Sequence, residues 1–338
     1  MIIIDGSEGE GGGQVVRTAC ALSLVTGEPF RIANVRGGRD RPGLMRQHVT
    51  AIEAACAIGT ATCEGLSVGS SEIAFRPGRI VPGEYQFAVG TAGSTALVLQ
   101  TVLMPLLRAD GPSRLVLEGG THNPQAPPFE FLARAFLPIL NHMGPKVCLR
   151  LVRHGFYPRG GGRIEVDITP APLEPIACRE RGAPAGCSAR VLLAGLPLSI
   201  GERMMTAARK GLVDWPAPAF AIDELPADLG PGIVLLLERA FDHVTEVMSG
   251  FGRMGERAEA VAGTAARRIA GYAASGAFAG PYLADQLLLP MALAGGGSFT
   301  TVTPSKHSRT AASIIERFLG RRWSFTEDGE AGHRAELV

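Results

Sequence analysis

The chain has 338 residues, 46% hydrophobic and 19% charged, so it is long enough for more than one domain with a core of its own. Its net charge of +1 gives no overall positive field, so any contact with nucleic acid must come from a local patch. The six cysteines are scattered and form no C-x-x-C pair, which excludes a dense disulfide framework and is typical of a reduced, cytoplasmic compartment.

At the start of the chain, residues 1–5 read as a strand and are too short for a signal peptide. No apolar run is long and clean enough to span a membrane. Lysine is rare, since only Lys146, Lys210 and Lys306 occur among 33 basic residues. None of them follows a glycine, which excludes a P-loop, and none lies in a Lys-x-Asp-Gly pattern, which excludes the lysyl-nucleotide chemistry of ordinary ligases.

The predicted elements repeat along the chain in the order helix, strand, helix, strand. In the first copy they are residues 14–26, 30–35, 44–58 and 72–75, and in the second 94–107, 114–117, 128–143 and 147–152. The third copy opens with a helix at 285–293 and closes with a strand at 322–325. The first two copies start roughly eighty residues apart, and the third about 190 residues after the second, so about a hundred residues are inserted.

This spacing predicts an α/β fold with a large domain of three repeated β/α units and a smaller inserted α/β domain. We expect the large domain to comprise residues 1–180 and 276–338, and the inserted domain residues 181–275. The predicted elements of the insert are strands at 189–193 and 233–238 and an Ala-rich helix at 258–273. Glycine and proline cluster at both ends of it, as expected for crossings between domains.

The third copy carries the most informative stretch. Residues 287–293 are apolar and read as a buried helix that the glycines from Gly295 onward stop. Residues 298–303 read as a strand, and a polar loop at 304–308 leads to a helix with an apolar stripe. His307 lies where this loop enters the helix, and a helix N-terminus favours an anion, so we expect His307 to face a phosphate. The helix dipole and Lys306 should keep its imidazole neutral, as a nucleophile must be.

If the three copies stack, the loops that follow equivalent strands gather at one end of the molecule. They would bring His307 together with arginines, carboxylates and amides. The residues expected there are Glu10, Arg36, Arg39, Arg41, Arg46, Gln47, His48, His122, Asn123, Asp285 and Lys306. A nucleophile, a cluster of arginines and carboxylates in one place suit phosphoryl or nucleotidyl transfer.

Five motifs stand out: Gly9-Glu10-Gly11-Gly12-Gly13-Gln14, Arg36-Gly37-Gly38-Arg39 with Gln47-His48, Gly155-Phe156-Tyr157-Pro158 before a glycine triplet, Leu283-Ala284-Asp285-Gln286, and Pro304-Ser305-x-His307. Together they closely resemble the RNA 3'-terminal phosphate cyclase family, from Asp5 to about Phe318. The insert matches in position more than in motif. One departure is Ala311, where the family pattern commonly carries Asn. The resemblance implies three repeats with an inserted α/β domain, in agreement with the spacing.

The resemblance also implies an enzyme, a ligase-type nucleotidyl transferase that uses ATP to convert an RNA 3'-terminal phosphate to a 2',3'-cyclic phosphate. His307 would take AMP from ATP as a covalent histidyl–AMP, and the RNA phosphate would accept it as an RNA-pp-A end. The 2'-hydroxyl would then close the ring and expel AMP. A divalent metal, Mg²⁺ or Mn²⁺, would neutralise the triphosphate. The expected partner is RNA with a 3'-terminal phosphate, with no membrane, and the protein would be a monomer or homodimer.

Residue by residue, the resemblance assigns Glu10 as the metal ligand and His307 as the nucleophile. The nucleotide pocket would comprise Gln100, Pro127, Tyr282, Leu283, Ala284, Asp285 and Gln286, with Tyr282 and Pro127 offering apolar surface to adenine. The polar set that holds the RNA terminal phosphate and the triphosphate would comprise Arg17, Arg36, Arg39 and Gln47. The planar fork of arginine is suited to phosphate.

Two other classes of function stay open. A non-catalytic cyclase-like protein that binds RNA in ribosome assembly would lack the histidine, which this chain keeps at position 307. An enolpyruvyl transferase on the related repeat fold would use different charged residues and needs no histidine at a helix start. His48 either joins the site or only packs beneath Gln47. The remaining histidines outside the motifs, at 142, 154, 243 and 333, read as surface or core residues.

Overall fold

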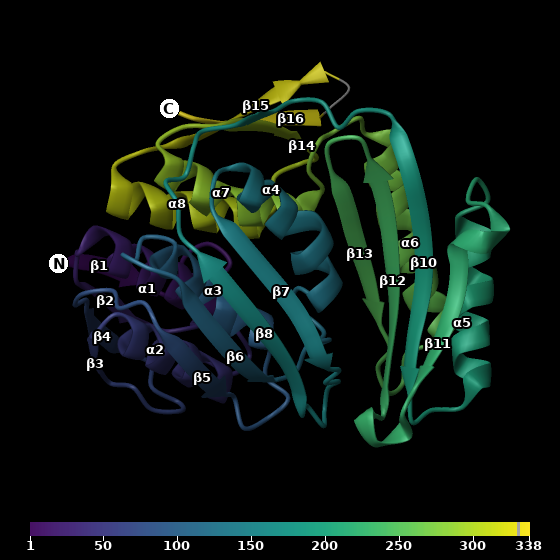
Figure 1. Ribbon diagram of the computed structural model, residues 1–338, viewed down its shortest axis with the longest axis horizontal. Helices are drawn as coiled ribbons and strands as arrows, with labels where there is room; N and C mark the ends of the chain where they lie inside the picture. The colour runs from purple at the N-terminus through teal and green to yellow at the C-terminus, as the bar shows by residue number, and fades with distance from the viewer. Residues whose placement is uncertain (330–331) are drawn as a thin grey trace.

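The computed structural model of the chain describes residues 1–329 and 332–338. Within them the strands form four sheets of four strands each, and helices pack between and against the sheets (Figure 1). None of the helices in this described part combines the length and the apolar composition that a membrane crossing requires. The mixed α/β class predicted from the sequence is confirmed.

Three of the four sheets have the same topology. In each, the first two strands are parallel, the second pairs antiparallel with the fourth, and the third lies at the edge beside the fourth. A helix joins the two parallel strands, as a parallel pair requires. The first unit contains β1 (Ile2–Asp5), α1 (Gly13–Thr26), β2 (Phe30–Ala33), α2 (Arg46–Ile58), β3 (Thr62–Glu64) and β4 (Ile73–Arg76).

The second and third units repeat this order, so the predicted three repeats are confirmed. The second contains β5 (Glu84–Ala88), α3 (Thr95–Leu106), β6 (Ser113–Gly119), the π-helix η1 (Phe131–Phe136), α4 (Leu137–His142), β7 (Lys146–Arg153) and β8 (Gly162–Thr169). The third contains β9 (Ala177–Cys178), α7 (Pro281–Ala294), β14 (Ser298–Thr301), α8 (Lys306–Leu319), β15 (Trp323–Asp328) and β16 (Gly332–Leu337).

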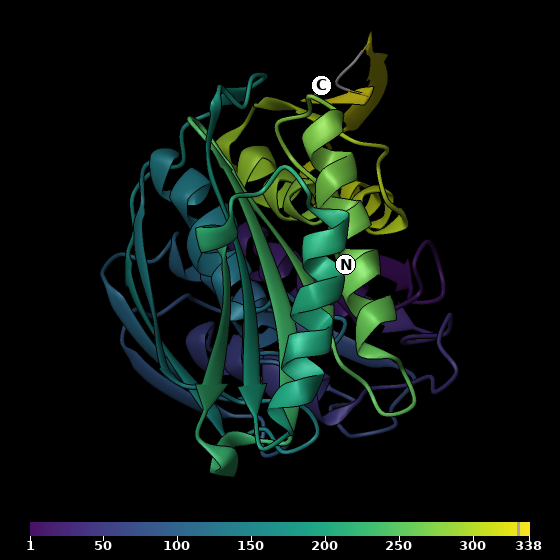
Figure 2. The same cartoon turned by 90° about the vertical axis from the view of Figure 1, so that its right-hand side faces the viewer.

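The fourth sheet interrupts the third repeat between its first strand, β9, and α7. This unit contains β10 (Pro184–Ala194), α5 (Leu198–Gly211), η2 (Ala217–Ala219), β11 (Phe220–Leu225), η3 (Ala227–Leu229), β12 (Gly232–Phe241), β13 (Thr245–Phe251) and α6 (Ala258–Ala274). Its sheet order is β11-β10-β12-β13, and α5 and α6 cover one face of it (Figure 2). The division of the chain into domains 1–180 with 276–338 and 181–275 stays a prediction.

Several elements differ from the sequence prediction. The second and third repeats begin with β5 and β9, which were not predicted from the sequence. Also not predicted were β3, α5, β8, β11, β13 and β16. β9 has only two residues, too few to form a pattern. β5 does alternate, with half-buried Tyr85 and Phe87 between exposed residues, so its sequence carries a strand signal that the prediction did not include. The helix predicted at 128–143 contains a π-helical segment, and the strand predicted at 298–303 ends at Thr301.

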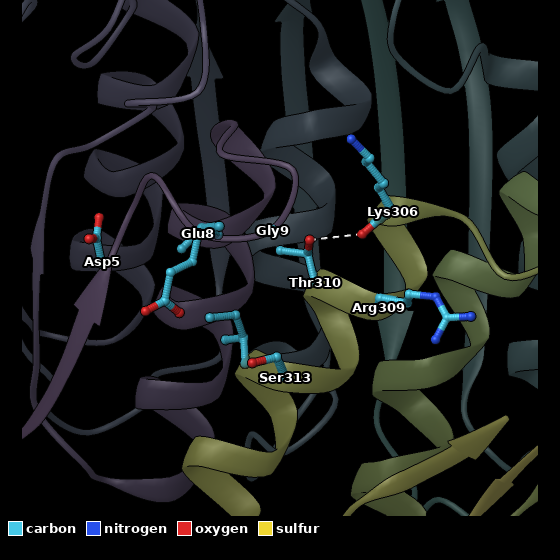
Figure 3. A pocket seen from close by; sticks show the side chains of 9 residues that line it. Asp5, Glu8, Gly9, Lys306, Arg309, Thr310 and Ser313 are labelled. Carbon is cyan, nitrogen blue, oxygen red and sulfur yellow. Dashed lines mark hydrogen bonds between the residues drawn. The ribbon is translucent and has the colours of Figure 1, made fainter.

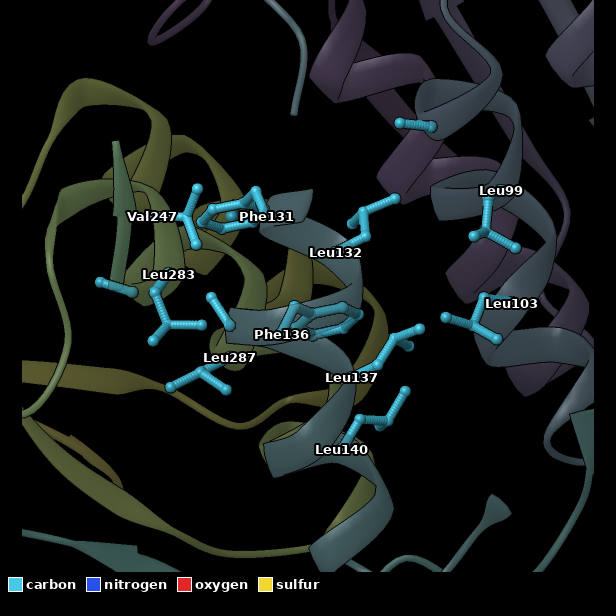
Figure 4. Packing of buried hydrophobic residues seen from close by; sticks show 14 of the residues in the cluster. Leu99, Leu103, Phe131, Leu132, Phe136, Leu137, Leu140, Val247, Leu283 and Leu287 are labelled. Carbon is cyan, nitrogen blue, oxygen red and sulfur yellow. The ribbon is translucent and has the colours of Figure 1, made fainter. Parts of the chain in front are cut away.

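The hydrophobic core joins all these units. Figure 4 shows Leu103 of α3, Phe136 of η1 and Leu287 of α7 gathered in one buried cluster, with Val247 of β13 at its edge. Burial of each such side chain contributes about 1.5–3 kcal/mol relative to an exposed one. A second, smaller cluster places Phe156, in the loop between β7 and β8, against the inserted sheet. The inserted unit is therefore packed on the second repeat.

This packing predicts that Gly232→Ala destabilises the protein. Gly232 begins β12, and an added Cβ would meet the ring of Phe156. We expect a loss of about 1–3 kcal/mol, the usual cost of overpacking a core. Gly186→Ala in β10 is the matched control, because a Cβ there meets nothing within 4 Å. Denaturant unfolding of both variants measures the difference, and equal midpoints would contradict this account of the interface.

Candidate active site

The helix α8 begins earlier than the sequence suggested. Ser305 is its N-cap, and the Ser305 hydroxyl oxygen accepts a hydrogen bond from the Ser308 backbone N–H at 2.9 Å. Lys306 and His307 therefore lie in the first helical turn, and the polar loop predicted at 304–308 is shorter than expected. The positive end of the helix dipole is at His307, as expected.

Two side chains from the first repeat hold the His307 ring. Its Nδ1 lies 2.9 Å from Gln14 Oε1 and 3.7 Å from Glu10 Oε2. An amide oxygen can only accept, so in this arrangement Nδ1 carries the hydrogen and the lone pair stays on Nε2. The His307 side chain is 48% exposed, which leaves Nε2 open to a ligand. The structure thus presents a fixed imidazole with a free nitrogen.

The pKa of His307 lies below its usual value because the ring is partly buried and because Arg39 and Arg17 are nearby cations. The expectation of a neutral imidazole agrees with this direction. The predicted source does not agree, since Arg39 and Arg17, rather than Lys306, are the cations that lower the pKa. Both arginines belong to the first repeat and are far from His307 in the sequence, so a local sequence pattern could not show that they lie near it.

Glu10 reaches the site from the glycine-rich turn between β1 and α1. Its backbone N–H donates to Thr310 Oγ1 at 2.9 Å. That hydroxyl in turn donates to the Lys306 carbonyl at 2.8 Å, the bond that is dashed in Figure 3. Gly9 has φ +62, and an added Cβ would collide with the Thr310 side chain. Glycine is therefore required where the turn meets α8.

A cavity of about 260 Å³ lies at this junction, between the turn and the face of α8 that carries Lys306, Thr310 and Ser313 (Figure 3). Its described lining comes from β1, the turn, α1 and α8. The predicted nucleotide residues on α3 and α7 do not line it, so this cavity is separate from the nucleotide pocket that the resemblance implies.

The Glu10 carboxylate fits the predicted metal role as a single protein ligand. Its side chain is 8% exposed, its Oε1 contacts the Arg39 guanidinium, and its Oε2 is buried without a hydrogen-bond partner. Mg²⁺ is typically held by one or two carboxylates together with water and substrate phosphates. In the described part of the chain no three His, Cys, Asp or Glu residues form a metal cage. Glu10 alone suits an ion that arrives with a phosphate ligand.

Arg36 and Arg17 are more buried than Arg39, whose side chain is 40% exposed. Arg36 has φ +55 and is 9% exposed, and its Nη1 donates to the carbonyls of Arg41 and Gly43 at 2.7 and 2.8 Å. Arg36 thus holds its own loop together, and its predicted contact with phosphate stays a prediction. Burial lowers the pKa of Arg17 to about 10, which leaves its guanidinium charged at neutral pH.

His48 is a buried capping residue. It is 3% exposed, and its Nδ1 accepts a hydrogen bond from the Met45 backbone N–H at 3.0 Å, at the start of α2. Burial and the neighbouring Arg17 and Arg36 lower its pKa to about 3. Of the two readings left open by the sequence, the structure supports packing. Gln47 beside it accepts from the Ser94 backbone N–H at 3.3 Å and so joins the first two repeats.

Within the second repeat, His122 is enclosed as well. Its ring lies between Thr121 Oγ1 at 2.8 Å and Glu130 Oε2 at 2.9 Å, and it stacks on His154 and Phe156. His122 is 1% exposed, so it packs in the interior and does not join His307 in an open site. His154, expected to be a surface or core residue, is half-buried in this stack.

The predicted nucleotide residues divide between two faces of α7. Tyr282 is 42% exposed, and Gln286 Oε1 accepts from Gln100 Nε2 of α3 at 2.6 Å. Leu283 and Ala284, in contrast, are 0% and 3% exposed and belong to the core. Only the backbone of those two residues is left for the nucleotide contact predicted for them. Pro127 is partly buried in the loop before η1.

Asp285 links α7 to the His307 helix. Its Oδ1 accepts from the hydroxyls of Ser305, at 2.9 Å, and Ser308. Burial raises its pKa to about 6, although both hydrogen bonds oppose the rise. Ser305, Ser308, Gln14 and Thr310 were not among the predicted site residues. Gln14 ends the glycine motif and Ser305 precedes the histidine, so both positions were visible in the sequence while their contacts were not.

Comparison with known proteins decides the family. The family model described as RNA 3'-terminal phosphate cyclase matches residues 8–325. The chain belongs to this family. The predicted resemblance is therefore confirmed, over nearly the range from Asp5 to Phe318 that the motifs indicated.

Curated relatives support the same family assignment. An RNA 3'-terminal phosphate cyclase of Koribacter versatilis is 49% identical over 97% of this chain and 92% of its own length. One of Ectopseudomonas mendocina is 47% identical over 100% of this chain and 98% of its own. Among solved structures, the enolpyruvyl transferase NikO from Streptomyces tendae aligns with 50% of this chain and 33% of its own at 16% identity, with a TM-score of 0.31. That likeness is too low to carry an argument.

The site geometry predicts that Arg39→Ala raises the pKa of His307. The change removes a nearby cation and also frees Glu10, whose Oε2 lies 3.7 Å from His307 Nδ1. Both effects favour the protonated ring, so the midpoint of its titration should move to higher pH. NMR titration of the imidazole measures this. Arg41→Ala, an exposed arginine in the same loop, is the control, and an unchanged or lowered midpoint in Arg39→Ala would refute the assignment.

Proposed function

We propose that this cyclase-family chain uses ATP to convert an RNA 3'-terminal phosphate to a 2',3'-cyclic phosphate through a histidyl–AMP and an RNA-pp-A intermediate. The observation that carries the proposal is the His307 ring, whose Nδ1 is held by Gln14 while Nε2 stays free at the start of α8. A lowered pKa keeps that nitrogen unprotonated at neutral pH.

In the first step, His307 Nε2 attacks the α-phosphorus of ATP. A nitrogen–phosphorus bond forms, the bond from this phosphorus to the β-bridging oxygen breaks, and pyrophosphate leaves. Arg39 and Arg17 lie close enough to lower the pKa of the ring, so they are placed to offset the negative charge that develops on the phosphate. The dipole of α8 acts in the same direction.

In the second step, an oxygen of the RNA 3'-phosphate attacks the same phosphorus, the nitrogen–phosphorus bond breaks and His307 is regenerated. The RNA then ends in a phosphoanhydride to AMP. In the third step, the vicinal 2'-hydroxyl attacks the 3'-phosphorus, loses its proton and expels AMP. Adenylylation thus converts an unreactive phosphate oxygen into a good leaving group, which divides one difficult reaction into easier ones.

The remaining residues have binding roles in this scheme. Tyr282 and Pro127 would contact adenine, while Gln100, Asp285 and Gln286 would supply polar groups around the nucleotide. Arg36 and Gln47 belong to the predicted phosphate set. Glu10 would hold Mg²⁺ or Mn²⁺, which when bound neutralises phosphate charge. A cytoplasmic location and a monomeric or homodimeric state also remain predictions.

The first functional prediction concerns the nucleophile. Incubated with α-labelled ATP and Mg²⁺ but without RNA, the wild type should acquire covalent AMP that is stable to alkali and labile to acid, as a phosphoramidate is. His307→Ala should acquire none, because the attacking nitrogen is gone. His243→Ala, an exposed histidine of the inserted unit, should label like the wild type. Equal labelling of His307→Ala would place the nucleophile elsewhere, and an unlabelled wild type would favour a non-catalytic binding protein.

The second prediction concerns the order of steps. A strand ending in a 2'-deoxy 3'-phosphate should still accept AMP, because adenylyl transfer involves only phosphate oxygens. It lacks the 2'-hydroxyl and should therefore stall as a stable adenylylated end. Gel analysis of matched ribo-terminated and deoxy-terminated strands with ATP and Mg²⁺ tests this. Recovery of only unmodified deoxy strand, under conditions that cyclise the ribo strand, would contradict the proposed intermediate.

A further inference from the structure

A buried carboxyl group of the inserted unit touches the start of α7. Glu246 lies on β13 and is 0% exposed. Its Oε2 accepts a hydrogen bond from the backbone N–H of Gly280 at 2.6 Å. Gly280 is the N-cap of α7, so a side chain from a different sheet satisfies one of the backbone groups at the entry to this helix.

The Glu246 carboxyl and the Gly280 backbone are in close contact. A Cβ added to Gly280 would come within 2.5 Å of Glu246 Oε2, so the carboxyl lies directly against the backbone of the cap. The residue after Glu246, Val247, packs beside Phe131 and Leu283 in the core (Figure 4). Glu246 therefore cannot shift without disturbing either the cap or this packing.

A second contact joins the inserted unit to the same turn of α7. Arg268 of α6 donates from Nη1 to the Tyr282 hydroxyl at 3.1 Å. Tyr282 is two residues past the N-cap and half exposed, and it is the side chain assigned to adenine. Two hydrogen bonds from the inserted unit thus converge on the first turn of the helix that carries Tyr282, Asp285 and Gln286.

We propose that Glu246 is a positioning residue for ATP, which holds the first turn of α7 in the orientation that its nucleotide-facing side chains require, with Arg268 orienting the Tyr282 ring. The proposal rests on the nucleotide role of α7 described above. It gives the inserted unit a part in the reaction, although neither Glu246 nor Arg268 is assigned a contact with the reacting atoms.

The surroundings of Glu246 determine its charge. Its Oε1 is buried without a hydrogen-bond partner, and burial raises the pKa of this carboxyl to about 8 in spite of the backbone hydrogen bonds from Gly280 and Val247. The other titratable groups that face it are the Tyr272 hydroxyl of α6 and, beyond that ring, the Arg181 guanidinium. The raised pKa favours the protonated form at pH 7, and ionisation between pH 7 and 9 places a charge in a buried site that disfavours it.

The test measures ATP affinity and self-labelling separately in the full chain. Calorimetric titration at pH 7 should show Glu246→Ala binding ATP about tenfold more weakly, the size expected when a helix loses one cap. Its maximal rate of labelling at saturating ATP should change much less. Glu246→Gln should restore wild-type affinity, because an amide is a neutral isostere that still accepts from Gly280. Arg268→Ala should also weaken binding, whereas Arg267→Ala, on the same helix but bonded only locally, should not.

The pH profile tests whether ionisation of Glu246 affects ATP binding. Because ionisation of this buried group also lowers stability, the profile is compared only at pH values where unfolding measurements show the wild type and the variants to be fully folded. Wild-type affinity for ATP should fall between pH 7 and 9 as Glu246 ionises, and Glu246→Gln should lack that component. Equal affinity of Glu246→Ala and wild type, or a wild-type pH profile in Glu246→Gln, would overturn the proposal. If the wild type binds ATP but acquires no label, the histidyl step fails while the affinities still decide the role of Glu246. If the wild type binds no ATP, both proposals fail.

Discussion

The site depends on one contact between the two ends of the chain, where the glycine-rich turn after β1 meets the first turn of α8. The Glu10 backbone N–H donates to Thr310, and Gln14 holds the His307 ring, across 300 and 293 residues of sequence. These bonds form only when the first and third repeats are packed together. His307 on an isolated helix would have neither a fixed tautomer nor a carboxylate beside it.

The same packing brings His307 close to two arginines of the first repeat, which favours the neutral imidazole that the proposed mechanism requires. Arg17 and Arg39 lower the pKa of His307. Guanidinium groups in proteins are in general charged at neutral pH. Glu10 lies against Arg39 and limits the local excess of positive charge. A lysine cluster would be less suited, because lysines that lie close together lose protons more readily than arginines. The basic residues near His307 that lower its pKa are accordingly arginines, and the chain has only three lysines.

The helix α7 connects this centre to the rest of the molecule. One face, with Leu283 and Leu287, is buried, and the other carries side chains bonded to α3 and α8. Its N-terminus follows directly on the inserted unit, which interrupts the third repeat after β9. An insertion at this point is linked to the His307 helix, because the chain that leaves it enters α7, whose Asp285 accepts hydrogen bonds from Ser305 and Ser308.

Local pattern by itself indicated the three repeats and the place of His307 at a helix start, because periodicity, glycine stops and motif spacing lie in neighbouring residues. The bounds of the inserted domain stay a prediction. Tertiary structure decided the rest. β9 is a strand only through its pairing with β14, and Arg36 and His48 proved to support their own loops. Which residues of 282–286 are exposed, and which cations act on His307, depend on packing between distant segments. Burial and electrostatic neighbours of this kind arise only when the chain is folded, so no local pattern contains them.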